Sequence, residues 1–418
     1  LEKKGIKVIS LDFEHQHNPE NLLKIRTNRI HQAKTLVSFL DEPENFGLLR
    51  AFNSMLSHFP DSLISSHIMS NNEKVKELIA HQVDSWEHLS CVFFNLYQLR
   101  SLALFNHPDF CLYKTKGLIS PWTKEDIQSE KHIAEKIGHV HLLIVGFGQL
   151  GRAFFREASN LASINTEHKL HITILDRQAS TLFDYFANDI TELEKVCEVS
   201  LLEYSLESRA LRPALKKLST EDPITAVVFC LDNQKQSMLS ASRLNPYFPQ
   251  AELAIYTPSP ISVEALVQAI QTMRGQIVTF GENRSILTSE VLVNEHLLQE
   301  AIRFNAYYNQ TASELLSEPM NTLSPQEQWN MLSNFKRESS IAQSLHRPAK
   351  LEILHKIAEA KDQTVEDLLQ TWEAQLHALP LEEQIQTITE NPAMYYFSAL
   401  EHLRWNNFHY MRDSSFHQ

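Results

Sequence analysis

Three glycines in one short turn are the residues whose type and spacing point most clearly to chemistry. They form the pattern G-x-G-x-x-G between an apolar run at 142–145 and an expected helix at 150–161. In such a turn the first glycine permits a tight bend, the second lets backbone approach a pyrophosphate, and the third lets the helix pack on the strand. The unpaired N–H groups and positive dipole at a helix start attract phosphate. The predicted nucleotide-binding residues of this turn are Gly146, Gly148, Gln149, Leu150 and Gly151.

Acidic side chains follow the neighbouring expected strands. Asp176 ends the second apolar segment, where a carboxylate can accept hydrogen bonds from ribose hydroxyls. Arg177 either helps to hold the nucleotide or is a solvated surface side chain. Glu203 and Asp232 follow the next two strands, at the edge where open α/β sheets bind ligands. Asp232 has the alternative role of capping a helix at 234–244. Strand, helix, strand and acid in this order predict a Rossmann-type unit, although the glycine pattern alone is a weak signal.

A parallel sheet is needed to position these residues, and the segment 139–305 has the pattern of a complete one. Apolar runs alternate with expected helices, as they do in βα units. The strands are expected at 140–145, 170–175, 199–202, 226–231, 253–256 and 276–280, and the helices at 150–161, 178–194, 207–218, 234–244 and 260–272. A following run at 288–308 without glycine or proline predicts one long helix.

The first 115 residues show a similar alternation without a glycine-rich turn. Strands are expected at 5–12, 35–41, 63–69 and 89–96, and helices at 21–32, 44–57 and 74–81. Residues 7–12 align with 198–203, and residues 35–41 align with 226–232, at the same offset of 191. Duplication explains a shared offset, and chance similarity of βα segments is the alternative. We therefore expect a partial first unit at 1–115, and a linker with a helix at 116–138.

From residue 306 onward the pattern becomes helical. No glycine follows Gly281, and apolar residues recur at helical spacing. Helices are expected at 326–335, 338–345, 350–360, 364–378 and 393–410. The predicted fold class is α/β, with one partial and one complete Rossmann-type parallel sheet, followed by an all-α domain at 306–418.

Aromatic and charged side chains in the helical domain form a second candidate ligand site. An aromatic ring, an arginine and a carboxylate can stack a planar ligand and hydrogen-bond its edge. Glu401 and Trp405 are four residues apart and would share a helix face. The alternative is a buried Arg–Glu pair that braces packed helices, with the tryptophans in the core. The candidate pocket residues are Trp329, Arg337, Glu401, His402, Arg404 and Trp405.

The composition is that of a soluble globular protein of several domains. The net charge of −13 over 418 residues argues against a nucleic-acid-binding surface, although a local basic patch remains open. No apolar run approaches the roughly 20 residues that cross a bilayer, and we expect no signal peptide at 1–20. The four cysteines are far apart, so we expect reduced thiols in a cytosolic protein. The chain begins without methionine, so we expect a fragment.

The sequence predicts neither a catalytic centre nor a metal site. A nicotinamide-dependent enzyme needs a general acid or base beside the ring, and Glu290, Glu295 and His296 read as faces of one helix. The pairs His15–His17 and His139–His141 do not match a known ligand spacing such as H-E-x-x-H.

Two families resemble the chain through these segments. Residues 139–303 resemble the regulator of potassium conductance (RCK) domain through LLIVGFGQLGR, ILDRQA, VVFCLDNQKQSMLSASRL and IVTFGENRSILTSEVL. Residues 1–115 resemble the tail half of a first RCK domain, with VSFLDEPENFGLLRAF in the matching place. Residues 300–412 resemble the prokaryotic relatives of the ryanodine receptor (RyR) repeat through AIRFNAYY, the segment 336–340 and LEHLRW at 400–405.

The resemblance implies a regulatory assembly of tandem RCK units with a helical domain that senses a second small molecule. NAD or an adenine nucleotide would bind as a ligand and bias the gating of a potassium-type channel or transporter. The resemblance also implies a homodimer or higher homo-oligomer, a membrane pore segment upstream of this chain, and a cytoplasmic location, with the cytosolic part of an inner-membrane protein as one form of it. The rival functions are an NAD(P)-dependent oxidoreductase and an interaction scaffold that binds no nucleotide.

Overall fold

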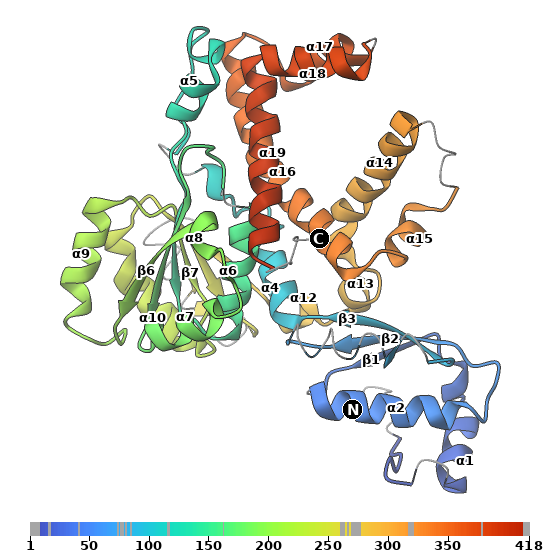
Figure 1. The fold of residues 1–418 in the computed structure, drawn as a ribbon. Helices are drawn as coiled ribbons and strands as arrows, with labels where there is room; N and C mark the ends of the chain where they lie inside the picture. Colours follow the sequence, from blue (N-terminus) through green and yellow to red (C-terminus); the bar gives the residue numbers. More distant parts are fainter. Residues whose placement is uncertain are drawn as a thin grey trace. The chain divides into compact units, whose positions relative to one another are not determined.

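The structure, a computed structural model, describes residues 9–15, 18–40, 42–72, 86–114, 118–161, 163–259, 277–316, 322–377 and 379–412, with a few positions within 75–83 and 264–268. The chain divides into two compact units. Unit 1 consists of Leu1–Leu99 with Ile286–His296, and unit 2 consists of Arg100–Ser285 with Leu297–Gln418. Each unit contains its own parallel sheet (Figure 1). This division is coarser than the four segments predicted from the sequence, whose boundaries stay a prediction.

The sheet of unit 2 has six parallel strands in the order β6-β5-β4-β7-β8-β9. The strands are β4 (His141–Val145), β5 (Leu170–Asp176), β6 (Cys197–Glu203), β7 (Ala226–Phe229), β8 (Glu252–Tyr256) and β9 (Val278–Phe280). Strand β4 is buried along its whole length because it is central and both its faces are covered. All six strands confirm the expected strands, and the parallel order confirms the Rossmann-type fold class.

Helices cover both faces of this sheet (Figure 1). They are α6 (Gln149–Leu161), α7 (Ala179–Ala187), α8 (Leu193–Val196), α9 (Leu211–Glu221) and α10 (Gln234–Leu244). Leucines of α9 and α10 pack against the face that carries Leu143 and Val145. The side chain of Ile144 points to the opposite face, where it lies next to Gly151 of α6. The helix expected at 178–194 is instead the pair α7 and α8, and most of the helix expected at 260–272 lies outside the described residues.

The sheet of unit 1 has three parallel strands in the order β1-β2-β3. Its described elements are α1 (Pro19–Thr27), η2 (Ile30–Gln32), β1 (Thr35–Ser38), α2 (Glu42–Leu56), β2 (Ile64–Met69), β3 (Leu89–Phe94) and α13 (Ser289–Leu292), and α4 (Leu96–Phe105) continues from this unit into unit 2. Strand β1 starts 191 residues before β7, and β1-β2-β3 repeats the parallel order of β7-β8-β9. The tandem relation between the two units stays a prediction. Most of the helix expected at 74–81 lies outside the described residues.

One predicted strand of unit 1 is wrong over its described part. Residues 9–12 of the strand expected at 5–12 are irregular, and residues 5–8 lie outside the described residues. The backbone N–H of Asp12 donates to Oδ1 of Asn21 over 2.9 Å, and Nδ2 of Asn21 donates to the carbonyl of Asp12 over 2.6 Å. The buried amide of Asn21 therefore pairs with backbone groups that a strand would have used for its ladder.

The C-terminal region of unit 2 is helical, as predicted. Its helices are α14 (Gln299–Leu316), α15 (Pro325–Asn330), α16 (Asn334–Ala360), α17 (Val365–His377), α18 (Leu381–Glu390) and α19 (Pro392–Tyr410). The single helix expected at 288–308 is wrong, because Glu295 has a left-handed φ of 49° and separates α13 from α14. Two separate helices were also expected around Pro348, but α16 continues through it. Its buried face (Ala342, Leu345, Ala349 and Ile353) outweighs the roughly 3 kcal/mol cost of an internal proline.

Within the part of the chain that the structure describes, none of the helices has the length and apolar character needed to cross a bilayer. The cysteines Cys91, Cys111, Cys197 and Cys230 are all free thiols. Two of them are buried: Cys197 begins β6, and Cys230 directly follows β7. Burial raises the pKa of Cys197 to about 12, so this thiol stays protonated at neutral pH.

Candidate functional site

The glycine turn joins β4 to α6 at the point where the strand order of the sheet reverses. Strand β4 lies between β5 and β7, and the chain runs from β4 to β5 on one side before it returns to β7 on the other. The N–H of Gly146 donates to the carbonyl of Leu175 over 2.9 Å, and the N–H of Cys230 donates to the carbonyl of Val145 over 2.8 Å. Ligands of open α/β sheets bind at such a switch point. The turn that the sequence singled out therefore occupies the expected place.

Each of the three glycines has a different physical reason to be glycine. Gly146 has a φ of +92°, and a Cβ there would lie 2.6 Å from Leu231. A Cβ on Gly151 would lie 2.2 Å from the carbonyl oxygen of Gly146, so the helix could not approach the turn this closely. A Cβ on Gly148 would meet nothing within 4 Å. Neither the fold nor the backbone conformation requires glycine at 148, and the open space there is where a phosphate group could approach the backbone.

Asp176 lies at the carboxyl end of β5 and points to the glycine turn. Its Oδ2 accepts from the N–H of Phe147 over 2.9 Å, and its Oδ1 accepts from the N–H of Gln178 over 3.0 Å. Each oxygen of an ionised carboxylate can accept a further hydrogen bond. The half-buried carboxylate is thus held by backbone and retains capacity for ligand hydroxyls. Arg177 is exposed, which leaves its two predicted roles open.

Glu203 and Asp232 also lie at the carboxyl edge. Glu203 is directly opposite Asp176 in the sheet register, and its Oε2 accepts from the hydroxyl of Ser180 over 2.5 Å. The predicted capping role of Asp232 is wrong, because Oδ1 of Asn233 caps α10 by accepting from the N–H of Gln236 over 3.1 Å.

Asp232 lines an open cleft beyond the ends of β7 and β8. The cleft has a volume of about 490 Å³, and it is lined by Asp232, Asn233, Gln234, Lys235, Pro258, Ser259 and Asn283. Asn283 accepts a hydrogen bond of 2.9 Å from Arg100, whose guanidinium stacks 5.1 Å from the ring of Tyr256. The first lining residue, Asp232, directly follows Leu231, the side chain that a Cβ on Gly146 would meet.

Arg152 is a cation beside the turn that sequence reasoning missed. Its Nε donates to the carbonyl of Gly148 over 3.4 Å, and its guanidinium lies 5.6 Å from the ring of Tyr185. Its place in the first turn of α6, one residue after the last glycine, was the sequence feature that could have indicated a phosphate-binding role. A cation at this place can offset the charge of a bound phosphate.

The six candidate pocket residues of the helical region come together as three pairs. Trp329 is fully buried and lies 5.6 Å from the guanidinium of Arg337. Trp405 is 44% exposed and stacks with His402 at 6.3 Å. The third pair is Glu401 and Arg404, which are joined by hydrogen bonds of 2.9 and 2.7 Å.

The Glu401–Arg404 pair has the geometry of a brace between helices. Arg404 is only 3% exposed, and Oε2 of Glu401 accepts from Nζ of Lys350 on α16 over 2.5 Å. Burial opposes the charge of Glu401, but hydrogen bonds and charge from Arg404 and Lys350 outweigh burial and lower the pKa of this carboxyl. The arrangement of these two residues therefore agrees with the alternative to a ligand pocket, an Arg–Glu pair that braces packed helices.

The helical region holds the chain segment that follows α6. Within unit 2, α16 and α19 both contact α6. The imidazole of His346 donates to the carbonyl of Ser163 over 2.9 Å, and the hydroxyl of Tyr396 donates to the carbonyl of Ile164 over 2.7 Å. Nδ2 of Asn407 donates to the hydroxyl of Ser163 over 3.0 Å. One end of α6 thus forms the glycine turn, and the other end is tied to α16 and α19.

Acid is expected to weaken unit 2 through His346. Burial, followed by the positive charge of Lys350, lowers the pKa of His346 from 6.5 to about 3. The unfolded chain gains a proton below pH 6.5 while the folded chain does not, so the free energy of unfolding falls as pH drops from 6.5 toward 3. The expected loss is about 1.4 kcal/mol per pH unit for one buried histidine. His346→Gln should flatten this pH dependence in urea unfolding, and an unchanged slope would contradict it.

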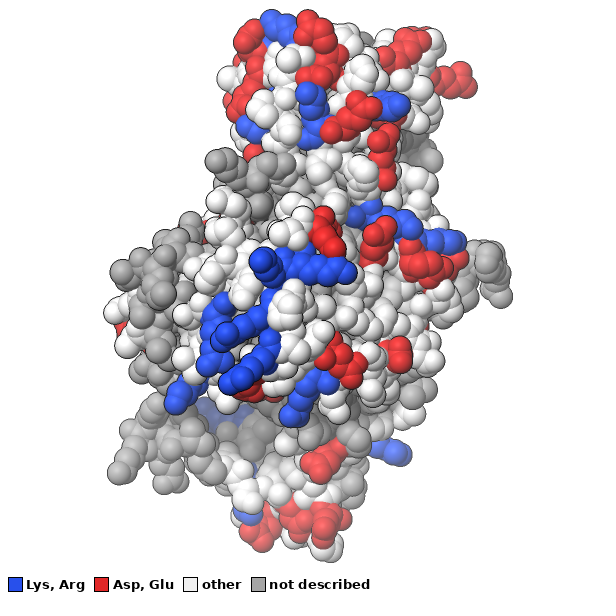
Figure 2. Space-filling model, turned by 90° about the vertical axis from the view of Figure 1, so that its left-hand side faces the viewer, with Lys and Arg blue, Asp and Glu red and all other residues white. Residues whose placement is uncertain are grey.

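Lysine and arginine side chains gather on the face of unit 2 that includes α9 (Figure 2). The exposed cations of this helix are Arg212, Lys216 and Lys217, and Lys217 lies 3.7 Å from Glu221. The net charge of −13 is therefore not spread evenly, and the local basic patch that the sequence left open is present.

Comparisons with known proteins find distant structural similarity. No model of a protein family matches the sequence, and no curated protein matches it. A solved structure described as "Crystal Structure of the GsuK RCK domain" is similar, with a TM-score of 0.40 and 13% sequence identity. The similarity covers 72% of this chain and 70% of that chain. The function must therefore be argued from the residues of this chain.

Proposed function

We propose that the chain is a nucleotide-binding regulatory module, in which the glycine turn and Asp176 hold NAD or an adenine nucleotide as a ligand. The observation that carries this proposal is that the structure requires glycine at two of the three positions of the turn and not at the third. Gly146 and Gly151 are required by a left-handed φ and by close packing, whereas Gly148 borders open space. A turn of purely structural purpose would not need a glycine at 148.

The residues at the turn fit the parts of a nucleotide. The phosphates would lie against Gly148 and the start of α6, where backbone N–H groups lack intrahelical acceptors. Arg152 would neutralise part of their charge. The ribose hydroxyls would donate to Asp176, which is already oriented by the N–H groups of Phe147 and Gln178. These groups bind and orient a ligand, and no catalytic residue is assigned to them.

Regulation would use α6 as the link between the bound ligand and the helical region. The hydrogen bonds of His346, Tyr396 and Asn407 hold Ser163 and Ile164, just beyond the far end of α6. A ligand changes such an arrangement only if it binds two arrangements with different affinity. We infer that the nucleotide favours one placement of α6 against α16 and α19.

The partner is proposed from the sequence resemblance to RCK domains and RyR repeats. On that basis the module would act as a cytosolic homodimer or higher homo-oligomer that biases a potassium-type channel or transporter. The repeated parallel order of β1-β2-β3 and β7-β8-β9 supports a tandem arrangement of two such units. The helical region would then sense a second small molecule.

Asp176→Asn is expected to weaken nucleotide binding by about 10- to 100-fold, which corresponds to the loss of one charge-assisted hydrogen bond. The amide keeps an oxygen that can accept from Phe147, so the turn should remain folded. The measurement is calorimetric titration of the whole chain with NAD, NADH, ATP, ADP and cyclic dinucleotides. Asp184→Asn, an exposed acid on α7, is the matched control and should bind like the unmodified chain.

The same titrations separate the rival functions. If the unmodified chain binds none of these nucleotides, the interaction scaffold is favoured and the proposal is wrong. If NADH or NADPH is consumed with a substrate in a coupled absorbance assay, the chain is an oxidoreductase. Binding without turnover, lost in Asp176→Asn and kept in Asp184→Asn, supports the regulatory module.

A further inference from the structure

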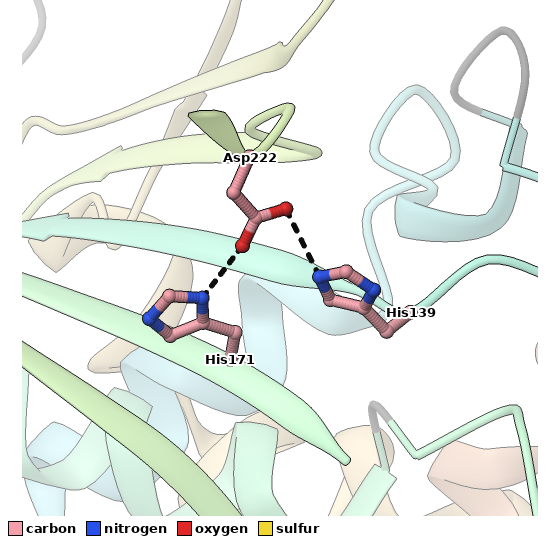
Figure 3. Close-up of side chains that lie close together, drawn as sticks. All are labelled: His139, His171 and Asp222. Atoms are coloured by element: carbon pink, nitrogen blue, oxygen red, sulfur yellow. Dashed lines mark hydrogen bonds and ion pairs between the residues drawn. The ribbon is translucent and has the colours of Figure 1, made fainter. Parts of the chain in front are cut away.

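Three metal-ligand side chains from separate segments meet at the edge of the unit 2 sheet opposite the glycine turn. His139 precedes β4 by two residues, His171 is the second residue of β5, and Asp222 follows α9 on the way to β7. Because β5, β4 and β7 are neighbours and parallel, their amino-terminal ends lie together. The two imidazole rings flank the Asp222 carboxylate (Figure 3).

The three side chains are close enough to share one ion. Nε2 of His139 lies 3.0 Å from Oδ1 of Asp222, and Nδ1 of His171 lies 2.6 Å from Oδ2 of Asp222. All three ligand atoms lie within 4.8 Å of one another. The side chains are 36%, 17% and 21% exposed for His139, His171 and Asp222, so an ion can reach them from solvent. The cluster is therefore formed and accessible.

The surroundings hold the cluster in an orientation suited to ligation. The second ring nitrogen of His171 lies 2.9 Å from the hydroxyl of Ser200, which leaves Nδ1 directed at Asp222. The fully buried ring of His141 stacks on His171 at 3.9 Å. Its Nε2 lies 2.8 Å from the hydroxyl of Thr173, and its Nδ1 lies 2.8 Å from Oδ2 of Asp222, so His141 positions the carboxylate from the buried side. Metal-binding histidines almost always have such a partner on the other nitrogen, because it fixes the tautomer and the ring plane.

We propose that His139, His171 and Asp222 bind a divalent transition-metal ion of the zinc class. Two imidazole nitrogens and one carboxylate oxygen are a donor set that suits zinc, whereas calcium and magnesium prefer oxygen ligands throughout. Tetrahedral zinc keeps its ligand atoms about 3.3 Å apart, so the pairs at 3.0 and 2.6 Å would open by about 0.3 and about 0.7 Å. The ion takes the place of the proton on each ligating nitrogen: a neutral imidazole carries that proton on its other ring nitrogen instead, and an imidazolium releases it to solvent.

Bound in this way, the ion would join the beginnings of neighbouring strands and the segment after α9. Three protein ligands leave a fourth coordination position for water or for a ligand from another molecule. The site is independent of the nucleotide site, since the two lie at opposite edges of one sheet. The proposal of a metal site therefore does not depend on the proposed nucleotide-binding function.

The test is calorimetric titration of the metal-free whole chain with Zn²⁺, with Mg²⁺ as the hard-ion comparison. His139→Ala and Asp222→Asn remove one ligand each. Loss of a hydrogen-bond partner behind a ligand typically costs 10- to 100-fold in metal affinity, so loss of a ligand should cost at least about 100-fold. His15→Ala is the matched control, because His15 with Asp12 and Glu14 forms an exposed cluster of imidazole and carboxylate groups.

The results expected are one tight Zn²⁺ site in the unmodified chain, much weaker binding in both ligand variants, and unchanged binding in His15→Ala. Thermal unfolding of the unmodified chain should rise in temperature with Zn²⁺ and not with Mg²⁺. Substitution by Co²⁺ should give the visible absorption of a tetrahedral site, a readout that does not depend on a variant folding. Absence of a tight Zn²⁺ site, or equal affinity in folded His139→Ala, would overturn the proposal.

Discussion

Gly148→Val is expected to abolish nucleotide binding while the chain remains folded and as stable as before. The added side chain meets no protein atom within 4 Å of its Cβ, so the fold has room for it. It would occupy the space in which a pyrophosphate approaches the backbone. We expect the dissociation constant to rise by at least about 100-fold, equivalent to about 2.8 kcal/mol of binding free energy. Calorimetric titration measures the affinity, and urea unfolding measures the stability.

Gly151→Ala provides the contrast in the same turn. Its Cβ would lie 2.2 Å from the carbonyl oxygen of Gly146, which is backbone and cannot rotate away. Helix α6 would have to move off β4, and we expect a loss of about 3 kcal/mol of unfolding free energy, the upper end for overpacking. Tight binding by folded Gly148→Val would show that the turn is not the nucleotide site. Equal destabilisation by both variants would show that position 148 is structural.

Local signals were enough to predict most of the unit 2 sheet and its turn. The run 142–145 is apolar throughout because β4 is buried on both faces, and that burial leaves an unmistakable pattern. Gly146 and Gly151 could be predicted because the adjacent backbone requires glycine at both positions, and Gly148 because it completes the spacing of the pattern. Asp176 could be predicted because a strand end determines where its side chain lies. These inferences depend on residues close together in the chain.

The features that the sequence missed depend on contacts between distant segments. His139 and Asp222 are 83 residues apart, and only the order of β5, β4 and β7 brings them together. The side chain of Asn21 forms hydrogen bonds with the backbone N–H and carbonyl of Asp12, so these groups do not join a strand ladder. Hydrophobic periodicity does not reveal such a pairing. The continuity of α16 through Pro348 rests on burial against neighbouring helices. Propensity alone favours a break there.

In the helical region, Glu401 is a better position than Trp405 for testing whether the candidate residues form a ligand pocket. Trp405, one of the candidate pocket residues, is 44% exposed and contacts His402 and His409 on its own helix. Its replacement should therefore change stability little. Glu401 is the more informative position, because Arg404 and Lys350 both donate to its carboxylate.

Glu401→Gln is expected to lower the free energy of unfolding of unit 2 by about 2 kcal/mol, less than for a fully buried ion pair because the Glu401 side chain is 32% exposed. Arg404, which is 3% exposed, would keep its charge without a counterion, and Lys350 would lose its partner. Urea unfolding followed by far-ultraviolet circular dichroism measures the loss. Glu300→Gln is the matched control, because Glu300 pairs with Arg303 and Arg347 at the surface and should contribute little.

The two variants together decide between a brace and a ligand pocket at Glu401. A brace requires that Glu401→Gln destabilise the helical region much more than Glu300→Gln, with no ligand present. If Glu401 only binds a ligand, its replacement should leave the stability of the ligand-free chain nearly unchanged. Equal stability of both variants would therefore restore Glu401 and Arg404 as candidates for ligand recognition. A selective loss in Glu401→Gln instead leaves Trp405 and His402, on the exposed side of α19, as the residues available to a second ligand.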